Sequence, residues 1–413
     1  MKRWLVDHKS NIHRWLLLTA MGLTHVWLYW LGDNGIGTPM WDLNNVYAPW
    51  VSQMAESHRV LGVDSNWIYP FPDVVPLVIA ALLVPSNYQL GWVTMVGVLN
   101  LVALAAILGW RSKPKPEAIG AGWFWVVAVL VLGPVSISRL DSVSVALAVL
   151  AVAFLVREKT GTASALMAIG TWVKIWPVAF FLACIGARKR FKRAWLVGGG
   201  TGLGILVLGL LVAKPQYLFS FASGQVSRGI QIEAPVATPW LWLGIQNPIE
   251  AGIRFSRELL TFQVFGPLTM EIGRLMDLSQ VVALLITALL AFRAGSKQTI
   301  GYNQENQVLT WAFMTAVLDL IVFNKVGSPQ YYGWLLAPVV LAFLWQVPRR
   351  HLLAGIVLAI SLLTGLVFPL FYDQLLSQDL LATALLTARN LAVIGLLVWS
   401  NISLSRLAKQ QLS

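Results

Sequence analysis

Carboxylates gather in one short polar stretch of a chain that is otherwise poor in charge. The sequence has only 18 acidic residues among 413, and five of them lie between residues 32 and 73: Asp33, Asp42, Glu56, Asp64 and Asp73. A positioned carboxylate can take a proton from a reacting hydroxyl group and so act as a general base. The stretch stands between two hydrophobic runs, which places this chemistry at a membrane surface.

Asp42 stands just ahead of a predicted helix within that stretch. The apolar spacing from Val46 to Arg59 favours a short amphipathic helix that could lie on the membrane interface. An acid before a helix is often only an N-cap that satisfies free backbone N–H groups. On spacing alone, Asp42 could therefore be a cap or a reacting group.

Charged residues also interrupt apolar sequence further along the chain. They are Arg139 and Asp141 in SRLDS, Lys174 shortly before Pro177, and Lys325 in FNKVGSPQYYGW. An ionisable group at membrane depth is functional by default, because placing it there costs on the order of a few kcal/mol or more. Simpler interpretations stay open: the lysines could snorkel to the interface, and Arg139 could form a local salt bridge with Asp141.

The composition indicates an all-α polytopic membrane protein. Hydrophobic residues make up 57% of the chain and charged residues 12%, which is too little charge to cover a soluble globule of this size. The sequence predicts one integral membrane domain over 1–413 with 10–13 hydrophobic helices. The runs long enough to span, at about 20 residues each, lie near 14–31, 88–110, 120–138, 194–213, 307–323, 331–347, 351–371 and 381–400.

Shorter apolar runs predict broken or re-entrant helices. They lie near 74–84, 141–156, 161–174, 175–187 and 280–293. A backbone that stops part-way through a bilayer is tolerated only where protein or a water-filled cavity covers it. Several such runs in one chain therefore indicate a cavity that is entered from one side.

Basic residues in short turns set the expected orientation. Basic loops stay in the cytoplasm, and the densest basic turn covers residues 188–193. With that turn inside, both termini are cytoplasmic, and three segments share the external face: the first external loop 32–73, a second external segment 214–279, and the turn 324–330. The segment 214–279 is either a cover over the cavity or a solvated loop. The net charge of +12 is thus explained by basic cytoplasmic turns that orient the protein in the membrane, and it does not indicate nucleic-acid binding.

The order of these motifs resembles glycosyltransferase family 87. The motifs are Asp42 with Val46-Tyr47, Tyr69-Pro70-Phe71-Pro72, Arg139-Leu140-Asp141, Lys174 with Pro177, Arg228-Gly229-Ile230-Gln231-Ile232-Glu233, and Asn324-Lys325 with Ser328-Pro329-Gln330-Tyr331-Tyr332 and Trp334. The family consists of polytopic enzymes of the GT-C fold, best known in actinobacteria as polyprenyl-phosphate-mannose-dependent mannosyltransferases. The turn around Lys325 is also similar to the catalytic subunit of GPI mannosyltransferase I.

The resemblance implies a multi-pass enzyme of a bacterial plasma membrane, surrounded by membrane lipids. It implies that a sugar, most readily mannose, moves from a polyprenyl-phosphate donor to a lipid-linked or glycan acceptor by an inverting single displacement. Asp42 matches the family position of the general base. The cations expected to bind the donor phosphate are Lys325, Arg228 and Lys174. The residues expected to contact the sugar or the acceptor are Gln330, Glu233, Asp141, Arg139, Trp41, Tyr47, Tyr69 and Tyr331.

No cofactor is required on this interpretation. Cys184 is the only cysteine and no HExxH, CxxC or glycine-rich nucleotide cradle occurs, so the sequence offers no thiolate or zincin metal motif. A divalent metal ion at the phosphate stays open.

Several alternatives remain from the sequence. One extra residue separates Asp42 from Val46-Tyr47 compared with the family pattern Asp-x-x-Val-Tyr, which keeps Asp33 as an alternative base. The family's phosphatidylinositol mannoside branch has a His-containing turn where this chain has Gln330-Tyr331-Tyr332, so the identity of the acceptor stays open. The transferred sugar could also be arabinofuranose instead of mannose.

A secondary transporter or lipid flippase would also use broken helices with midplane charges. Such a protein would be expected to show an internal repeat, but the 32–73 loop has no counterpart in the second half of the chain.

Overall fold

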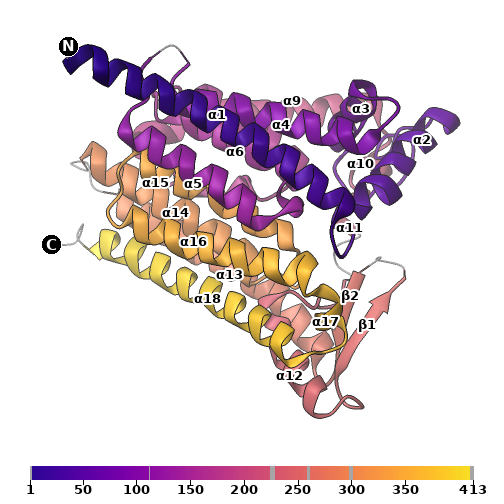
Figure 1. Cartoon of the computed structure of the whole chain (residues 1–413). Helices are drawn as coiled ribbons and strands as arrows, with labels where there is room; N and C mark the ends of the chain where they lie inside the picture. The colour runs from indigo at the N-terminus through magenta and orange to yellow at the C-terminus, as the bar shows by residue number, and fades with distance from the viewer. Residues whose placement is uncertain (1, 111, 224–227, 258–260, 297–300, 410–413) are drawn as a thin grey trace.

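The computed structural model describes residues 2–110, 112–223, 228–257, 261–296 and 301–409. They form a bundle of long helices that run side by side, with both termini at the same end (Figure 1). Five of the described helices are long and apolar enough to cross a membrane. The expected all-α polytopic membrane fold is confirmed, and each apolar run singled out in the sequence coincides with a helix.

The elements of the first half of the chain are, in order, α1 (Lys2–Asn34), the π-helical turn η1 (Leu43–Tyr47), α2 (Ala48–Ser57), the 3-10 turn η2 (Phe71–Asp73), α3 (Val74–Leu83), α4 (Tyr88–Leu108), α5 (Pro116–Leu132), η3 (Pro134–Ser136), α6 (Leu140–Leu155), α7 (Thr160–Val173), α8 (Val178–Cys184) and α9 (Arg188–Val212). The elements of the second half are α10 (Pro215–Leu218), α11 (Ser220–Ser223), η4 (Pro235–Ala237), α12 (Thr238–Gln246), β1 (Gly252–Ser256), β2 (Thr261–Phe265), α13 (Thr269–Gly295), α14 (Tyr302–Val322), η5 (Pro329–Leu335), α15 (Leu336–Leu344), α16 (Arg350–Gly365), η6 (Leu366–Leu370), α17 (Tyr372–Leu376) and α18 (Leu380–Lys409).

Helix α3 enters the bundle and returns without crossing it. α1 and α4 run antiparallel, because Asn87 donates to the Tyr29 hydroxyl at one end and Arg14 donates to the Gly109 carbonyl at the other. The chain between them therefore leaves and re-enters at the same end of the bundle. α3 lies within that connection and packs against α4, which makes the run near 74–84 re-entrant.

Helices α7 and α8 form a second interrupted element. The Trp172 indole at the end of α7 donates to the Gly202 carbonyl at 3.2 Å, and α9 continues for ten more residues, roughly 15 Å at the α-helical rise. After a break at 174–177, α8 turns back, and Phe181 packs on Trp195 near the start of α9. Lys174 therefore stands at the tip of a helical hairpin that stops part-way along the bundle.

The loops expected on one face meet at the end of the bundle away from the termini. The Ser220 hydroxyl accepts a hydrogen bond from the Trp67 backbone N–H at 2.9 Å, and the Gln231 N–H donates to the Lys325 carbonyl at 2.9 Å. The antiparallel hairpin β1–β2 lies at this same end, beside α12 and α17 (Figure 1). The segment 32–73, the segment after α9 and the turn after α14 are thus in direct contact.

Three local features differ from the sequence-based expectation. The hairpin β1–β2 was not expected, and α13 begins at Thr269 instead of near residue 280. The helix expected from Val46 to Arg59 is α2 over Ala48–Ser57, preceded by η1. α2 can start inside the expected range because Pro49, which lacks an N–H group, occupies its first turn.

The arrangement predicts which residues are accessible from outside the cell. In a Cys184→Ser background, we expect Ser57→Cys and Ser377→Cys to react with a membrane-impermeant maleimide in intact cells. Both serines are exposed, at the end of the bundle where the loops meet. Ser296→Cys, near the end of α13 that lies with the termini, should react only after permeabilisation. Reaction of Ser57→Cys only after permeabilisation would reverse the assigned orientation.

Candidate active site

Two cation–carboxylate pairs stand next to each other at the start of α6. The Arg139 Nε lies 3.2 Å from the Asp42 Oδ2, and the Lys174 Nζ lies 3.4 Å from the Asp141 Oδ2. Arg139 has extended backbone, the helix begins at Leu140, and the Ser142 hydroxyl accepts from the Arg139 N–H at 3.4 Å. This change of backbone conformation sends the two side chains to different partners, so the local Arg139–Asp141 salt bridge is wrong.

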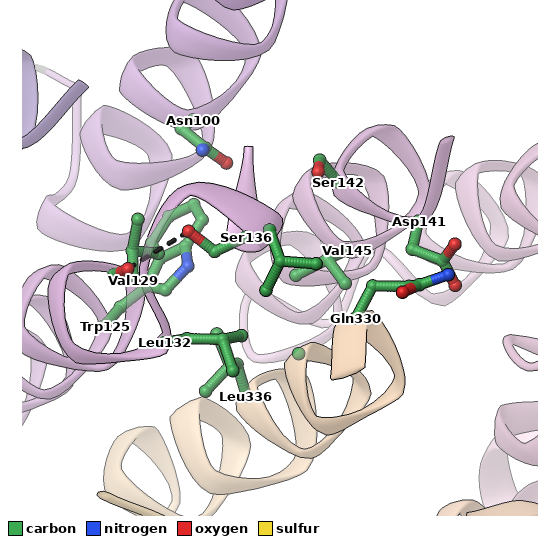
Figure 2. A pocket seen from close by; sticks show the side chains of 12 residues that line it. Asn100, Trp125, Val129, Leu132, Ser136, Asp141, Ser142, Val145, Gln330 and Leu336 are labelled. Atoms are coloured by element: carbon green, nitrogen blue, oxygen red, sulfur yellow. Dashed lines mark hydrogen bonds between the residues drawn. The ribbon is translucent and has the colours of Figure 1, made fainter. Parts of the chain in front are cut away.

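Asp141 is fully engaged by the protein. Its Oδ1 accepts a hydrogen bond from the Trp334 indole at 2.8 Å, while its Oδ2 faces Lys174. The side chain is only 3% exposed, and it lies beside Gln330 at the edge of a small cavity (Figure 2). Asp141 is therefore placed to hold Lys174 and the 329–335 turn, and it has little freedom to act as a base.

Lys174 sits in an aromatic enclosure. Its ammonium lies 4.8 Å from the centre of the Tyr69 ring and 6.0 Å from that of Tyr331, distances at which ring faces attract a cation. Tyr331 stacks on Trp334 with ring centres 4.2 Å apart. The simpler interpretation of Lys174 as a snorkelling lysine is wrong, because its side chain is 15% exposed and directed at these partners.

Asp42 is the accessible carboxylate of this group. Its side chain is 36% exposed, and although it stands at the start of η1 it makes no capping hydrogen bond. The N-cap interpretation is therefore wrong. Trp41 next to it is 46% exposed, whereas the alternative base Asp33 lies exposed on the last turn of α1.

Tyr47 ties the Asp42 turn to α6. The tyrosine is 3% exposed, and its hydroxyl accepts a hydrogen bond from the Leu140 N–H at 3.4 Å. Its ring packs on Trp50 and Trp92, with ring centres 5.7 and 5.2 Å away. Tyr47 thus holds Asp42 and Arg139 at a fixed separation from inside the protein.

The other two expected phosphate-binding cations are placed differently from each other. Arg228 lies within Coulombic range of Tyr331, and its Nε is buried without a hydrogen-bond partner in the described part of the chain. Lys325 is paired, with its Nζ 2.7 Å from the Asp277 Oδ2. The charges of Arg228 and Lys174 thus both act on Tyr331, while the ammonium of Lys325 is engaged at α13.

Glu233 is paired with a cation that the sequence analysis missed. The Arg389 Nη1 lies 3.5 Å from the Glu233 Oε2, its Nη2 donates to the Glu233 carbonyl, and its guanidinium covers Tyr332 at 4.5 Å. Burial raises the pKa of Glu233 to about 7, although Arg389 and Arg139 oppose that rise. A charged residue within the long apolar run of α18 is the same signal that drew attention to Lys174.

Asp73 is a second group that the site analysis left out. It is fully buried at the end of η2, and neither carboxyl oxygen has a hydrogen-bond partner among the described residues. The charges of Lys174 and Asp141 both act on this carboxyl group. A buried acid without partners favours its neutral form, so Asp73 can neighbour the Lys174–Asp141 pair without adding a second negative charge.

The described residues contain no group of three or more His, Cys, Asp or Glu side chains placed to hold a metal ion. The charges of the site come instead from cations that face single carboxylates or aromatic rings. Such cations can meet an anionic substrate group directly.

Fold and site together define a polytopic membrane protein with a charged, aromatic-lined centre at one end of interrupted helices. Residues 67–244 match the model of glycosyltransferase family 87. This match confirms the resemblance and indicates a membrane glycosyltransferase. The matched region carries Tyr69, Arg139, Asp141, Lys174 and Arg228, whereas Asp42 and Lys325 lie outside it. No curated protein matches the chain.

The environment of Glu233 predicts a pH dependence of stability. The folded protein keeps the Glu233 proton up to about pH 7, whereas the unfolded chain loses it near the ordinary value of 4.5. The contribution of this group to stability is therefore present at low pH and falls as the pH rises from about 4.5 to about 7. In Glu233→Gln we expect this decrease in stability with rising pH to be absent, as measured by the unfolding temperature between pH 5 and pH 8.

Glu250→Gln is the matched control, because Glu250 is exposed on the same segment. It should keep the pH dependence of the parent protein. Identical pH profiles for the parent and Glu233→Gln would show that Glu233 ionises in the folded protein as it does in the unfolded chain.

Proposed function

We propose that this protein transfers a sugar, most readily mannose, from a polyprenyl-phosphate donor to a hydroxyl group of a lipid-linked or glycan acceptor on the external face of the membrane. One observation carries the proposal. A partly exposed carboxylate, Asp42, and an enclosed cation, Lys174, are both held at the start of α6, because their partners Arg139 and Asp141 stand two residues apart there. A base and a phosphate-binding group are the two functions that such a transfer needs.

In the proposed reaction, the acceptor hydroxyl gives its proton to Asp42 as its oxygen attacks the anomeric carbon of the donor sugar. The bond between that carbon and the phosphate oxygen breaks, and the electron pair stays on the lipid phosphate. The anomeric configuration is inverted, because a single displacement takes place. Lys174 and Arg228 would stabilise the charge that develops on the departing phosphate, with Lys325 as a further cation nearby in the same loop assembly.

The neighbours of each reacting group support these roles. Arg139 holds the Asp42 carboxylate in position, with its Nε 3.2 Å from the Asp42 Oδ2. Asp141 and the Trp334 indole fix Lys174 in position, so its charge is oriented before the donor binds. The exposed ring of Trp41, the ring of Tyr69 and the amide of Gln330 are available for a sugar, while Glu233 and Tyr47 act from buried positions that shape the site.

The aromatic packing on the side of Lys174 that faces away from the loops favours an enzyme over a transporter or flippase. Trp176 there stacks on Trp334 and on Phe313, with ring centres 5.8 and 6.3 Å apart. Phe180 packs edge-on against Phe313 at 6.0 Å, and Trp176, Phe180 and Phe313 have no exposed surface. This aromatic stack separates the charged centre from the other end of the bundle.

The role of Asp42 is tested by Asp42→Asn. Asparagine keeps the shape and can still accept a hydrogen bond, but it cannot take a proton, and loss of a general base typically lowers the rate by about 10²–10⁴. The purified variant should bind polyprenyl-phosphate-mannose and transfer almost no labelled mannose to a membrane extract. Asp33→Asn should keep most activity, since Asp33 is exposed on α1. The reverse result would make Asp33 the base, and activity in both variants would exclude this mechanism.

The phosphate-binding cations are tested by Arg228→Ala and Lys325→Ala in the same assay. Removing one preorganised charge-stabilising donor typically costs about 10²–10³ in rate, and we expect a loss of this size. Arg254→Ala is the matched control, because Arg254 is exposed on β1 in the same external segment. A parent-like rate in either variant would remove that cation from the proposed phosphate site, provided that gel filtration shows the variant to be folded.

A further inference from the structure

A second cavity lies at the opposite end of the bundle from the candidate active site. Its volume is about 320 Å³, which falls within the range of small-ligand sites. The end of α4, the turn into α5 and the ends of α6 and α15 form its walls. Its apolar side consists of Ile107, Leu108, Ala118, Val156 and Leu344.

The polar side of this cavity is predominantly basic. Lys113, Lys115 and Arg157 line it together with one carboxylate, Glu117. Arg157 donates to the carbonyl oxygens of Ala153 and Ala106, at the ends of α6 and α4. These two hydrogen bonds hold the Arg157 guanidinium at the cavity wall.

A second arginine supports the turn that carries the two lysines. Arg14 on α1 donates to the Gly109 carbonyl at 2.9 Å and also to the Ser112 carbonyl. Gly109 ends α4 with a positive φ of 80°, which a residue with a side chain rarely adopts. Arg14 therefore anchors this turn to α1, beside the cavity.

The position of the cavity along the bundle matches the headgroup level of a membrane. Trp110, directly after α4, is 66% exposed, and exposed tryptophans concentrate at membrane–water interfaces. An apolar wall next to a basic wall at this level suits an amphiphile with an anionic head, and basic groups near a membrane surface attract anionic lipids.

We propose that this cavity binds the phosphate headgroup of an anionic phospholipid, with Lys113 and Lys115 contacting the phosphate and the apolar wall contacting the glycerol and upper acyl chain. The site lies in the leaflet opposite to the candidate active site. It is independent of the proposed transferase reaction, because it shares none of that site's residues.

The experiment is native mass spectrometry of protein released from nanodiscs that contain phosphatidylglycerol and phosphatidylcholine. The parent protein should retain one phosphatidylglycerol in preference to phosphatidylcholine, and Lys113→Ala with Lys115→Ala should lower that retention at least about tenfold. Leu344→Trp, which narrows the cavity without changing charge, should lower it as well. Unchanged retention in both variants would overturn the proposal.

Lys192→Ala with Arg193→Ala is the matched control, because it removes the same charge from exposed positions on α9 at the same end of the bundle. It should retain phosphatidylglycerol as the parent does. An equal loss in this control would show diffuse attraction between basic loops and lipid, which contradicts a specific binding site.

A parallel titration with inorganic phosphate separates the two sources of a phosphate group: a phosphate-dependent rise in unfolding temperature with no retained phospholipid would also overturn the lipid assignment.

Discussion

The Asp141–Lys174 pair is the interaction on which the candidate active site depends. Both side chains are removed from water, at 3% and 15% exposure, and breaking a buried pair on one side typically costs about 3–5 kcal/mol. The pair joins the start of α6 to the tip of the α7–α8 hairpin, and the Trp334 indole adds the turn before α15. Three interrupted elements therefore share one electrostatic centre, and Arg139 is directed to Asp42 as a consequence.

Four acidic residues around this centre have the same chemistry but different environments. Asp141 is saturated by its partners, Asp73 is buried without any among the described residues, and Glu233 is held by Arg389. Only Asp42 combines a charged partner with substantial exposure. Access and charge together, more than residue type, single out the carboxylate that can meet an acceptor.

The sequence predicted the helices well because apolar run length and bilayer thickness are directly related. It also picked out most charged residues of the site, since each interrupts apolar sequence. It could not predict their pairing: Arg139 stands two residues from Asp141 in sequence, yet its partner Asp42 lies far away along the chain. The hairpin β1–β2 was overlooked although Ile253, Phe255, Phe262 and Val264 follow the alternation of a strand pair.

Arg389 has a consequence for how the protein is made. It lies on α18, the last helix of the described chain, and holds Glu233 and Tyr332, which belong to segments synthesised much earlier. Ile232, Trp240 and Leu386 share a small apolar cluster at the same junction. The segment over the site therefore lacks its anchor until α18 has entered the membrane. During biosynthesis the site is therefore completed only after α18 has been synthesised, so a nascent chain that stalls before α18 carries the reactive residues without their final arrangement.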